Sequence, residues 1–385
     1  MNWIRSSLSF VIVALITLEI SSFIATKLNL FLVNDTPLFY QSNEHIPHVS
    51  RGRTNQEKWG AWHVQNATFR QTKSCFDVLM SFNEIGARDD SFIHLPKESI
   101  LLLGDSFAEG YGVSKIDSSE HLIETELGVP ILNFGSSGNF GPLQELIIYQ
   151  NFIDIPHKGL IIYVLPANDF TDNDSTFWSK IDRKLYRPYF SGNKNPLIPY
   201  YFPEALPTGT SREPFRQFIK DFFWSANAFR TALMLIRGDA KILNIAKTDT
   251  KIKSYFYEAT PSQQNNLIAA YKAIIELANE KEVLFVIIPS ENDISRWQNE
   301  AEQNKYKQQP WYQAFISFQD ISQNRVSVLN LMDNLPVDTE NLFLNCDGHW
   351  SPNGNRWASS LIVRHIQDND LFSSILRKND LFNRE

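Results

Sequence analysis

The feature that most restricts the fold of this sequence is an alternation of short apolar runs with helical stretches from Ser99 onward. Ile100–Leu103 has the pattern of a buried strand ended by Gly104, and residues 119–127 have a helical pattern. Further strands are expected at 129–134, 160–165, 283–288 and 326–331, with helices that begin at Pro142, Pro261 and Pro352. Strands that alternate with helices predict a three-layer α/β/α (flavodoxin-like) domain with a doubly wound parallel sheet of about five strands.

Composition divides the 385 residues into three parts. Residues 1–29 are an N-terminal apolar segment, 30–95 a polar stalk with an irregular leading segment, and 96–385 the α/β domain. The alternation breaks at about 170–255, where prolines and aromatic residues gather, so we expect an insertion with helices near 213–223 and 226–237. For its aromatic side chains we favour a satellite hydrophobic cluster over the lining of a sugar-binding cleft.

An apolar run near the N-terminus begins at Leu8 and continues past Glu19 to Ala25. As a helix these residues rise about 27 Å, enough to cross a hydrocarbon core. Arg5 ahead of the run predicts a cytoplasmic N-terminus. A cleaved signal peptide is the alternative, but residues 20–26 contain no good small-x-small cleavage site. We therefore expect a membrane anchor with an extracytoplasmic domain at the periplasm or cell surface, or a secreted domain if the segment is cleaved.

Charge and cysteine content exclude several function classes. The chain has 36 Lys+Arg and 43 Asp+Glu, a net charge of −7, and no basic cluster, so no nucleic-acid partner is expected. Two cysteines cannot form a four-thiolate zinc site. Gly135, Gly138 and Gly141 have the spacing G-x-x-G-x-x-G, which is not the dinucleotide fingerprint. We expect neither a metal nor an organic cofactor.

Two other sets of polar residues are expected to be structural. Asp169, Asp172 and Asp174 lack the central glycine and distal glutamate of a calcium loop and indicate a solvated acidic turn. His365 falls on the apolar face of the last helix and indicates a packed core histidine.

The sharpest chemical signal is Gly104-Asp105-Ser106, directly after the first expected strand of the sheet. Ligands of open α/β sheets bind beyond the carboxyl ends of the strands, which is where Ser106 is placed. A serine nucleophile needs a base that a third group orients. Asp347-Gly348-His349 follows the last strand and precedes the last helix. We therefore expect Ser106, His349 and Asp347 to meet at one edge of the sheet.

Two further strand ends offer donors for an oxyanion. The glycine-rich turn at 133–141 contains Gly138, whose backbone N–H is one candidate. Asn168, which follows Pro166-Ala167 after the third strand, offers a side-chain amide. Four strand ends thus each carry a plausible part of an acyl-transfer site.

Together these blocks resemble the SGNH (GDSL-type) hydrolase superfamily over roughly residues 80–366, with the motifs in the usual order. The resemblance implies that Ser106 is the nucleophile and that His349, oriented by Asp347, is the base. It also implies an oxyanion hole made by the N–H groups of Ser106 and Gly138 and by the amide of Asn168.

The sequence departs from this pattern at a few positions. Phe107 replaces the name-giving leucine, and Pro166-Ala167 stands where a glycine usually precedes the Asn-Asp pair. Asp347 and His349 are separated by one residue instead of the commoner two, so a backbone carbonyl is the alternative orienter of His349. Asp-x-His followed by Trp350 is similar to proteins that handle acetyl groups on exopolysaccharides. Residues 83–89 also resemble a segment that precedes the catalytic serine in exported bacterial members.

The resemblance implies a serine esterase, a hydrolase of ester bonds, that acts through an acyl-enzyme. Its expected substrate is an acylated glycan of the cell envelope or a secreted glycan, most simply an O-acetylated one, or a small ester. One alternative is an O-acyltransferase that uses the same residues and receives acyl groups from a membrane-embedded acyltransferase partner. The other is a non-catalytic glycan-binding or assembly protein that has the same fold.

The two cysteines, Cys75 and Cys346, lie far apart in the sequence. In an exported protein they could form a disulfide that pins the leading segment beneath the loop that carries Asp347. Two buried free thiols are an equally open interpretation.

Overall fold

The structure is a computed structural model of the chain. It describes residues 2–28, 53–56, 58–73, 75–93, 98–138, 140–180, 186–191, 197–202, 215, 218–219, 222–236, 259–297, 299–321 and 325–376. Of the predicted stalk and leading segment (30–95), residues 30–52 lie outside the described residues.

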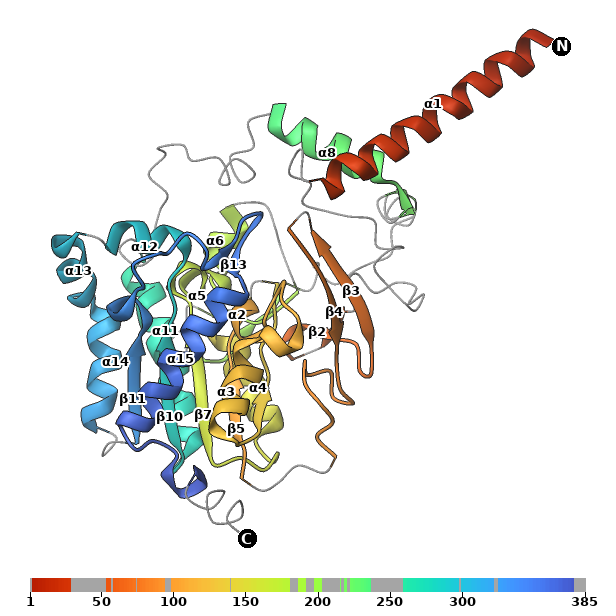
Figure 1. Ribbon diagram of the computed structural model, residues 1–385. Helices are drawn as coiled ribbons and strands as arrows, with labels where there is room; N and C mark the ends of the chain where they lie inside the picture. Colours follow the sequence, from red (N-terminus) through yellow and green to blue (C-terminus); the bar gives the residue numbers. More distant parts are fainter. Residues whose placement is uncertain are drawn as a thin grey trace.

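A parallel sheet of five strands forms the centre of the molecule (Figure 1). The spatial order of its strands is β6 (Ile131–Asn133), β5 (Ile100–Leu103), β7 (Gly159–Val164), β10 (Glu282–Ile287) and β11 (Val326–Asn330). Every neighbouring pair runs parallel. Numbered along the chain, the order is 2-1-3-4-5, the flavodoxin-like arrangement.

Helices cover both faces of the sheet, which confirms the predicted three layers (Figure 1). Leu101 and Leu103 of β5 share a core with α4 (Pro142–Phe152), α11 (Pro261–Ala278) and α14 (Pro310–Ile321). Ile100 and Leu102, which point to the opposite face, pack with α3 (Ser119–Leu127) and α15 (Pro352–Asp368). Because both faces are covered, every residue of β5 is apolar and buried.

The helix boundaries follow the capping signals in the sequence. Thr260 accepts a hydrogen bond from the Gln263 N–H while the Gln263 side chain bonds back to the Thr260 N–H, so α11 begins with a capping box. Ser351 caps α15 by accepting from the N–H groups of Asn353 and Gly354.

The segment that leads into the sheet forms two antiparallel hairpins, although its sequence shows no clear periodicity. These are β1 (Arg53–Gln56) with β2 (Gly60–His63), and β3 (Thr68–Lys73) with β4 (Phe76–Ser81). β1, β2 and β3 are short and contain few apolar residues, whereas β4 is mostly apolar and is buried at its first and fifth residues. Met80, Phe82 and Ala67 form a small separate core beneath the second hairpin.

The insertion contributes short elements around a small core of its own. Trp178, Tyr189 and Phe202 are buried together, as expected of a satellite cluster. Helix α5 (Pro166–Asp172) leads from β7 into the insertion, whose own elements are α6 (Ser175–Lys180), β8 (Tyr189–Phe190), β9 (Pro199–Tyr200) and α8 (Trp224–Ile236). Most of the helix predicted near 213–223 falls outside the described residues. Other short elements are α2 (Ser106–Glu109), α12 (Glu291–Trp297), α13 (Glu300–Lys307), η3 (Lys115–Asp117) and η5 (Leu331–Asn334).

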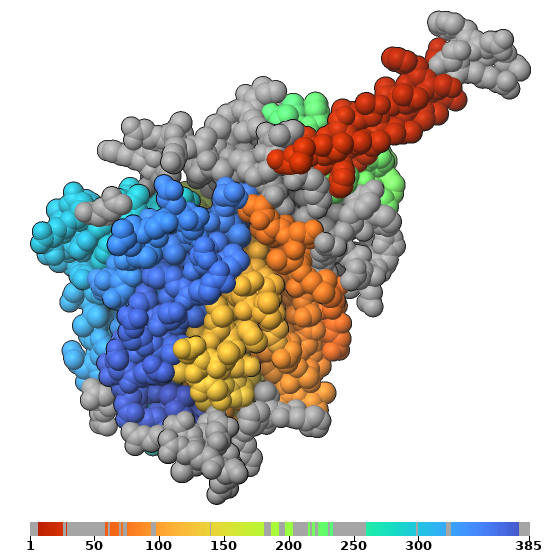
Figure 2. All heavy atoms as spheres, viewed as in Figure 1, coloured from red at the N-terminus to blue at the C-terminus, as the bar shows by residue number. Residues whose placement is uncertain are grey.

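The N-terminal helix α1 (Asn2–Lys27) projects away from the rest of the molecule (Figures 1 and 2). Within it, Ser7–Ala25 is long and apolar enough to cross a membrane by length and composition, a test that a signal sequence also passes. Its large apolar side chains, such as Phe10 and Leu15, are exposed. The N-terminal apolar helix predicted from the sequence is therefore present.

Candidate active site

Ser106 stands where strand β5 turns into helix α2. Asp105 caps this helix, because its carboxylate accepts a 2.9 Å hydrogen bond from the Phe107 N–H. Gly104 has a positive φ of 149°, and a side chain there would collide with Ala108 and Tyr163. β5 lies between β6 and β7, where the strand order reverses, so Ser106 sits at the topological switch point of the sheet.

His349 and Asp347 come from a hairpin outside the central sheet, formed by β12 (Phe343–Leu344) and β13 (Asp347–Trp350). Alternate residues of a strand share a face, so the spacing of one residue brings both side chains to the same side. His349 Nε2 lies 2.6 Å from Ser106 Oγ, and His349 Nδ1 bonds to Asp347 Oδ1. With Nδ1–H donating to the carboxylate, Nε2 can accept the serine proton. The partner of His349 Nδ1 is thus the Asp347 carboxylate, and not a backbone carbonyl.

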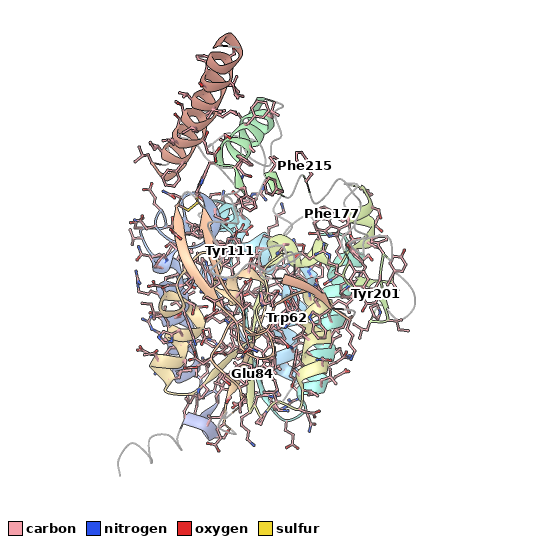
Figure 3. The ribbon with its side chains drawn as sticks, turned by 90° about the vertical axis from the view of Figure 1, so that its right-hand side faces the viewer. Trp62, Glu84, Tyr111, Phe177, Tyr201 and Phe215 are labelled. Atoms are coloured by element: carbon pink, nitrogen blue, oxygen red, sulfur yellow. A yellow bond between two sulfur atoms is a disulfide. The ribbon has the colours of Figure 1, made fainter. Side chains whose placement is uncertain are left out.

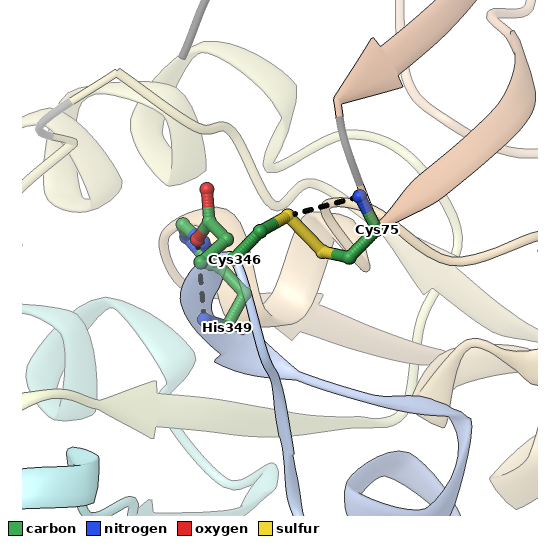
Figure 4. The surroundings of a disulfide bond; sticks show 4 residues. Cys75, Cys346 and His349 are labelled. Atoms are coloured by element: carbon green, nitrogen blue, oxygen red, sulfur yellow. Dashed lines mark hydrogen bonds and ion pairs between the residues drawn. A yellow bond between two sulfur atoms is a disulfide. The ribbon is translucent and has the colours of Figure 1, made fainter. Parts of the chain in front are cut away.

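The hairpin is fixed at both of its ends. Cys75 and Cys346 form a disulfide that joins the turn between β12 and β13 to the second leading hairpin (Figure 4). The Cys75 N–H also donates to Cys346 Sγ at 3.2 Å. At the other end, the buried Trp350 packs edge-on against Phe107, with ring centroids 4.9 Å apart. Of the two interpretations left open by the sequence, the structure has the disulfide.

Asn168 lies at the same edge of the sheet, in the first turn of α5. Pro166 opens this helix directly after β7. Asn168 Nδ2 donates to Asp105 Oδ2 at 3.2 Å, which ties the amide to the residue before Ser106. One N–H of an amide nitrogen makes such a bond, and its second N–H is available to a ligand.

Gly138 lies in the loop between β6 and α4, with φ at 100°. Two hydrogen bonds attach this loop to residues 104–106 (the serine turn) and to α2. The Ser136 N–H donates to the Gly104 carbonyl at 3.2 Å, and the Ser137 N–H donates to the Glu109 carboxylate. Within the described part of the chain, the N–H groups of Ser106 and Gly138 have no hydrogen-bond acceptor.

A buried polar network beneath α2 was not found from the sequence. Glu109, 1% exposed, accepts from the Ser137 N–H and lies 3.2 Å from His63 Nε2, while His63 Nδ1 contacts the Gly86 carbonyl at 2.8 Å. The Arg88 guanidinium donates to the Glu109 carbonyl at 2.5 Å. Arg88 belongs to the segment that resembles exported family members. Nothing in the sequence marks His63 as part of this network, because it comes close to Glu109 only in the folded chain.

Carboxyl groups are also buried behind Asn168, and here the sequence-based expectation was wrong. Asp169 and Asp172 are only 2% and 1% exposed, because α5 turns inward against the core and does not form a solvated turn. Burial, then repulsion from Glu145 and Asp105, raises the pKa of Asp169 well above its usual range. Burial likewise raises the pKa of Glu145. These shifts favour the neutral, protonated forms.

Burial also raises the pKa of Asp105 itself, while the Phe107 N–H and the charge of His349 act in the opposite direction. The carboxylate form of Asp105 therefore depends on the hydrogen bonds that it receives at the serine turn.

The remaining candidates have structural contacts. His365 Nε2 lies 2.8 Å from Ser327 Oγ, and burial lowers its pKa, in keeping with a packed core histidine. Among the described residues no group of three or more His, Cys, Asp or Glu side chains is arranged to hold a metal ion.

No family model and no curated protein matches the chain. Solved structures are similar to part of it. A member of the lipolytic protein G-D-S-L family from Veillonella parvula DSM 2008 is 11% identical, with 69% of this chain and 97% of that chain covered and a TM-score of 0.34. The lipase/acylhydrolase from Enterococcus faecalis is 12% identical, with 70% of this chain and 96% of that chain covered and a TM-score of 0.33. The acetyl xylan esterase Est2A from the rumen bacterium Butyrivibrio proteoclasticus is 8% identical, with 72% of this chain and 64% of that chain covered and a TM-score of 0.34.

The names of these structures belong to the class of protein that the sequence motifs resemble.

Proposed function

We propose that the chain is a serine esterase that hydrolyses ester bonds through a Ser106–His349–Asp347 triad. One observation carries the proposal: an unbroken path of hydrogen bonds from Ser106 Oγ through His349 to Asp347, at the switch point of a parallel sheet. A serine hydroxyl is a weak nucleophile, and a base oriented by a carboxylate is the arrangement that activates it.

In the proposed reaction Ser106 Oγ transfers its proton to His349 Nε2 and forms a bond to the ester carbonyl carbon. The N–H groups of Ser106 and Gly138 and the Asn168 amide stabilise the resulting oxyanion. The bond to the alcohol then breaks, and the alcohol leaves with the proton from His349. Water, deprotonated by His349, releases the acid from Ser106. Asp347 stabilises the imidazolium without taking its proton.

We further propose that the substrate is an O-acetylated glycan at the cell envelope and that α1 anchors the domain there. The apolar length of α1 supports the location, and the Asp-x-His-Trp resemblance supports the acetyl group. The Tyr111 ring lies 4.4 Å from the His349 ring and gives the base an aromatic neighbour on which a sugar could pack.

The test uses the purified full chain in detergent, with p-nitrophenyl acetate as substrate and a fluorophosphonate as serine-reactive probe. Wild type should turn over the ester and be labelled, and Ser106→Ala should do neither. Ser114→Ala is the matched control, since Ser114 is a hydroxyl residue on the loop after α2 that has no role in the triad. Labelling of Ser106→Ala equal to that of wild type would contradict the proposal.

The same residues can transfer the acyl group to a sugar hydroxyl instead of water. Adding an unacetylated oligosaccharide to the assay separates the two outcomes, because a transferase yields an acetylated sugar whereas a hydrolase yields only acetate. A folded wild type that binds the oligosaccharide but is inert to ester and probe would point to a glycan-binding protein.

A further inference from the structure

Helix α8 is attached to the N-terminal helix although the two lie about 200 residues apart. The Glu19 carboxylate accepts hydrogen bonds from the N–H groups of Trp224 and Ser225, the latter at 3.0 Å. These are the first two residues of α8, whose N–H groups have no partner inside the helix. Phe23, one turn along α1, packs edge-on against Trp224 with ring centroids 5.1 Å apart. The acidic residue that interrupts the apolar run is therefore paired.

This contact fixes the depth of α8 relative to the apolar segment. Glu19 lies six residues before Ala25, the last residue of that segment, which is about 9 Å along a helix axis. Amphipathic helices that lie in a membrane interface bury their apolar faces about 5–10 Å into the boundary between headgroups and acyl chains. If α1 spans a bilayer, α8 begins at this depth.

The residues around α8 expose aromatic side chains that a water-facing surface does not favour. Phe215 and Phe229 are 69% and 65% exposed, and Phe218 and Phe223 are exposed as well. A group of large apolar side chains on one segment marks a contact surface. Within α8, apolar side chains also reach the surface near the end of the helix, where Ala232 is exposed and Leu233 is half-buried.

We propose that α8 and the aromatic residues before it form a second membrane contact, lying in the interface of the lipid bilayer beside α1. The occupant is the bilayer, because the same surface is continuous with the apolar segment of α1. This inference rests on the anchor proposed for α1, and not on the esterase activity. The aromatic side chains of Phe215, Phe218, Phe223 and Phe229 face the acyl chains.

The contact also orients the active site. α1 and α8 lie at the end of the molecule where β13 lies (Figure 1), and Tyr111, which packs on His349, lies nearer that end than Glu84 does (Figure 3). A second contact beside α1 restrains rotation of the domain about its anchor. The edge of the sheet that carries Ser106 is thereby held toward the membrane.

The experiment places a fluorescent label on α8 in the full chain reconstituted in phosphatidylcholine vesicles with no other protein. Phe229→Cys is labelled with an environment-sensitive fluorophore, since Cys75 and Cys346 are paired and do not react. Quenching is measured with iodide in the water and with nitroxides on the lipid acyl chains. Position 229 should show a blue-shifted emission, strong nitroxide quenching and several-fold weaker iodide quenching than a control label.

The control is Glu280→Cys, an exposed position just before β10 and so at the opposite end of the sheet. A label at 229 that iodide quenches as strongly as the label at 280 contradicts the proposal and would leave the aromatic surface to a protein partner. Alkaline carbonate extraction of the same vesicles tests the anchor separately. Protein that carbonate removes contradicts both the anchor and this inference, whereas p-nitrophenyl acetate turnover in the same sample reports on the esterase alone.

Discussion

The two halves of the candidate triad are held in place by different means. Ser106 follows a central strand, and all four residues of its helix are buried. The buried Glu109 carboxylate accepts a hydrogen bond from the Ser137 N–H of the neighbouring loop, and the Arg88 guanidinium donates to the Glu109 carbonyl. His349 lies on a two-stranded hairpin outside the sheet, and its side chain is 23% exposed. A disulfide and one buried tryptophan fix that hairpin.

This difference implies different sensitivities. The serine half contains buried ionisable groups, so its stability should depend on pH. The histidine half depends on a covalent bond, so its geometry should depend on the redox state. The proposed mechanism requires both halves, so a change that displaces either half should lower turnover.

The largest effect is expected when either half loses its reacting group. His349→Ala and Ser106→Ala should each lower kcat by about 10³-fold or more. Without either residue, only substrate binding and the oxyanion hole still accelerate the reaction. The double variant should be no worse than the worse single variant, since the two residues act as one unit. Kinetics with p-nitrophenyl acetate measure this, and losses that multiply in the double variant would mean that the halves act independently.

The next effect separates the halves. Cys75→Ser combined with Cys346→Ser should lower kcat on the order of 10²-fold, because the hairpin loses one of its attachments and a small displacement of the base is costly. The free energy of unfolding should fall by about 2–4 kcal/mol. Reducing agent on wild type should reproduce both effects and should leave the double cysteine variant unchanged. A normal kcat in a destabilised variant would show that Trp350 alone positions His349.

A smaller effect is expected in the serine half. Glu109→Ala removes the acceptor of the buried Ser137 N–H beside Gly138 and should lower kcat about tenfold, equivalent to about 1.4 kcal/mol. Glu109→Gln retains an acceptor oxygen and should recover most of the activity. Steady-state kinetics of the pair, with urea unfolding as the check on folding, distinguish positioning from stability. Equal kcat values for wild type and Glu109→Ala would show that this hydrogen-bond network does not position the active-site residues.

The smallest effect is expected on stability, as a change in how the free energy of unfolding depends on pH. Burial raises the pKa of Asp89 from 3.8 to about 7, against the opposing bond from the Asn133 N–H. The folded state then holds the proton more tightly, so this contribution to stability is full below about pH 4 and is lost as pH rises through about 7.

Asp89→Asn carries no such proton. The difference in free energy of unfolding, wild type minus variant, should therefore decrease between pH 4 and pH 7 and then level off. Urea unfolding at several pH values measures it. A difference that stays constant across this range would mean that Asp89 titrates at the same pH in the folded and unfolded states.

The sequence predicts the serine half better than the histidine half. Strands such as Ile100–Leu103 are short, continuous apolar runs that have few alternatives, and Ser106 follows one of them directly. The Asp347–Trp350 strand is too short for a pattern, and its spacing of one residue becomes informative only once it is known to be extended. His63 and Glu109 meet across 46 residues, a contact that no local pattern encodes. The expectation of a solvated turn at Asp169 and Asp172 is wrong because the packing of α5 against the core, which no local pattern encodes, buries both side chains.

The disulfide that fixes the histidine hairpin also orders the steps of maturation. Cys75 precedes Cys346 by 271 residues, so at ordinary synthesis rates it emerges roughly 15–55 s earlier. Within this sequence it has no other cysteine to pair with during that interval. Pairing has a single intramolecular solution and needs no reshuffling. The bond can close only after nearly the whole α/β domain has been synthesised, so this disulfide is the last covalent bond to form at the candidate site.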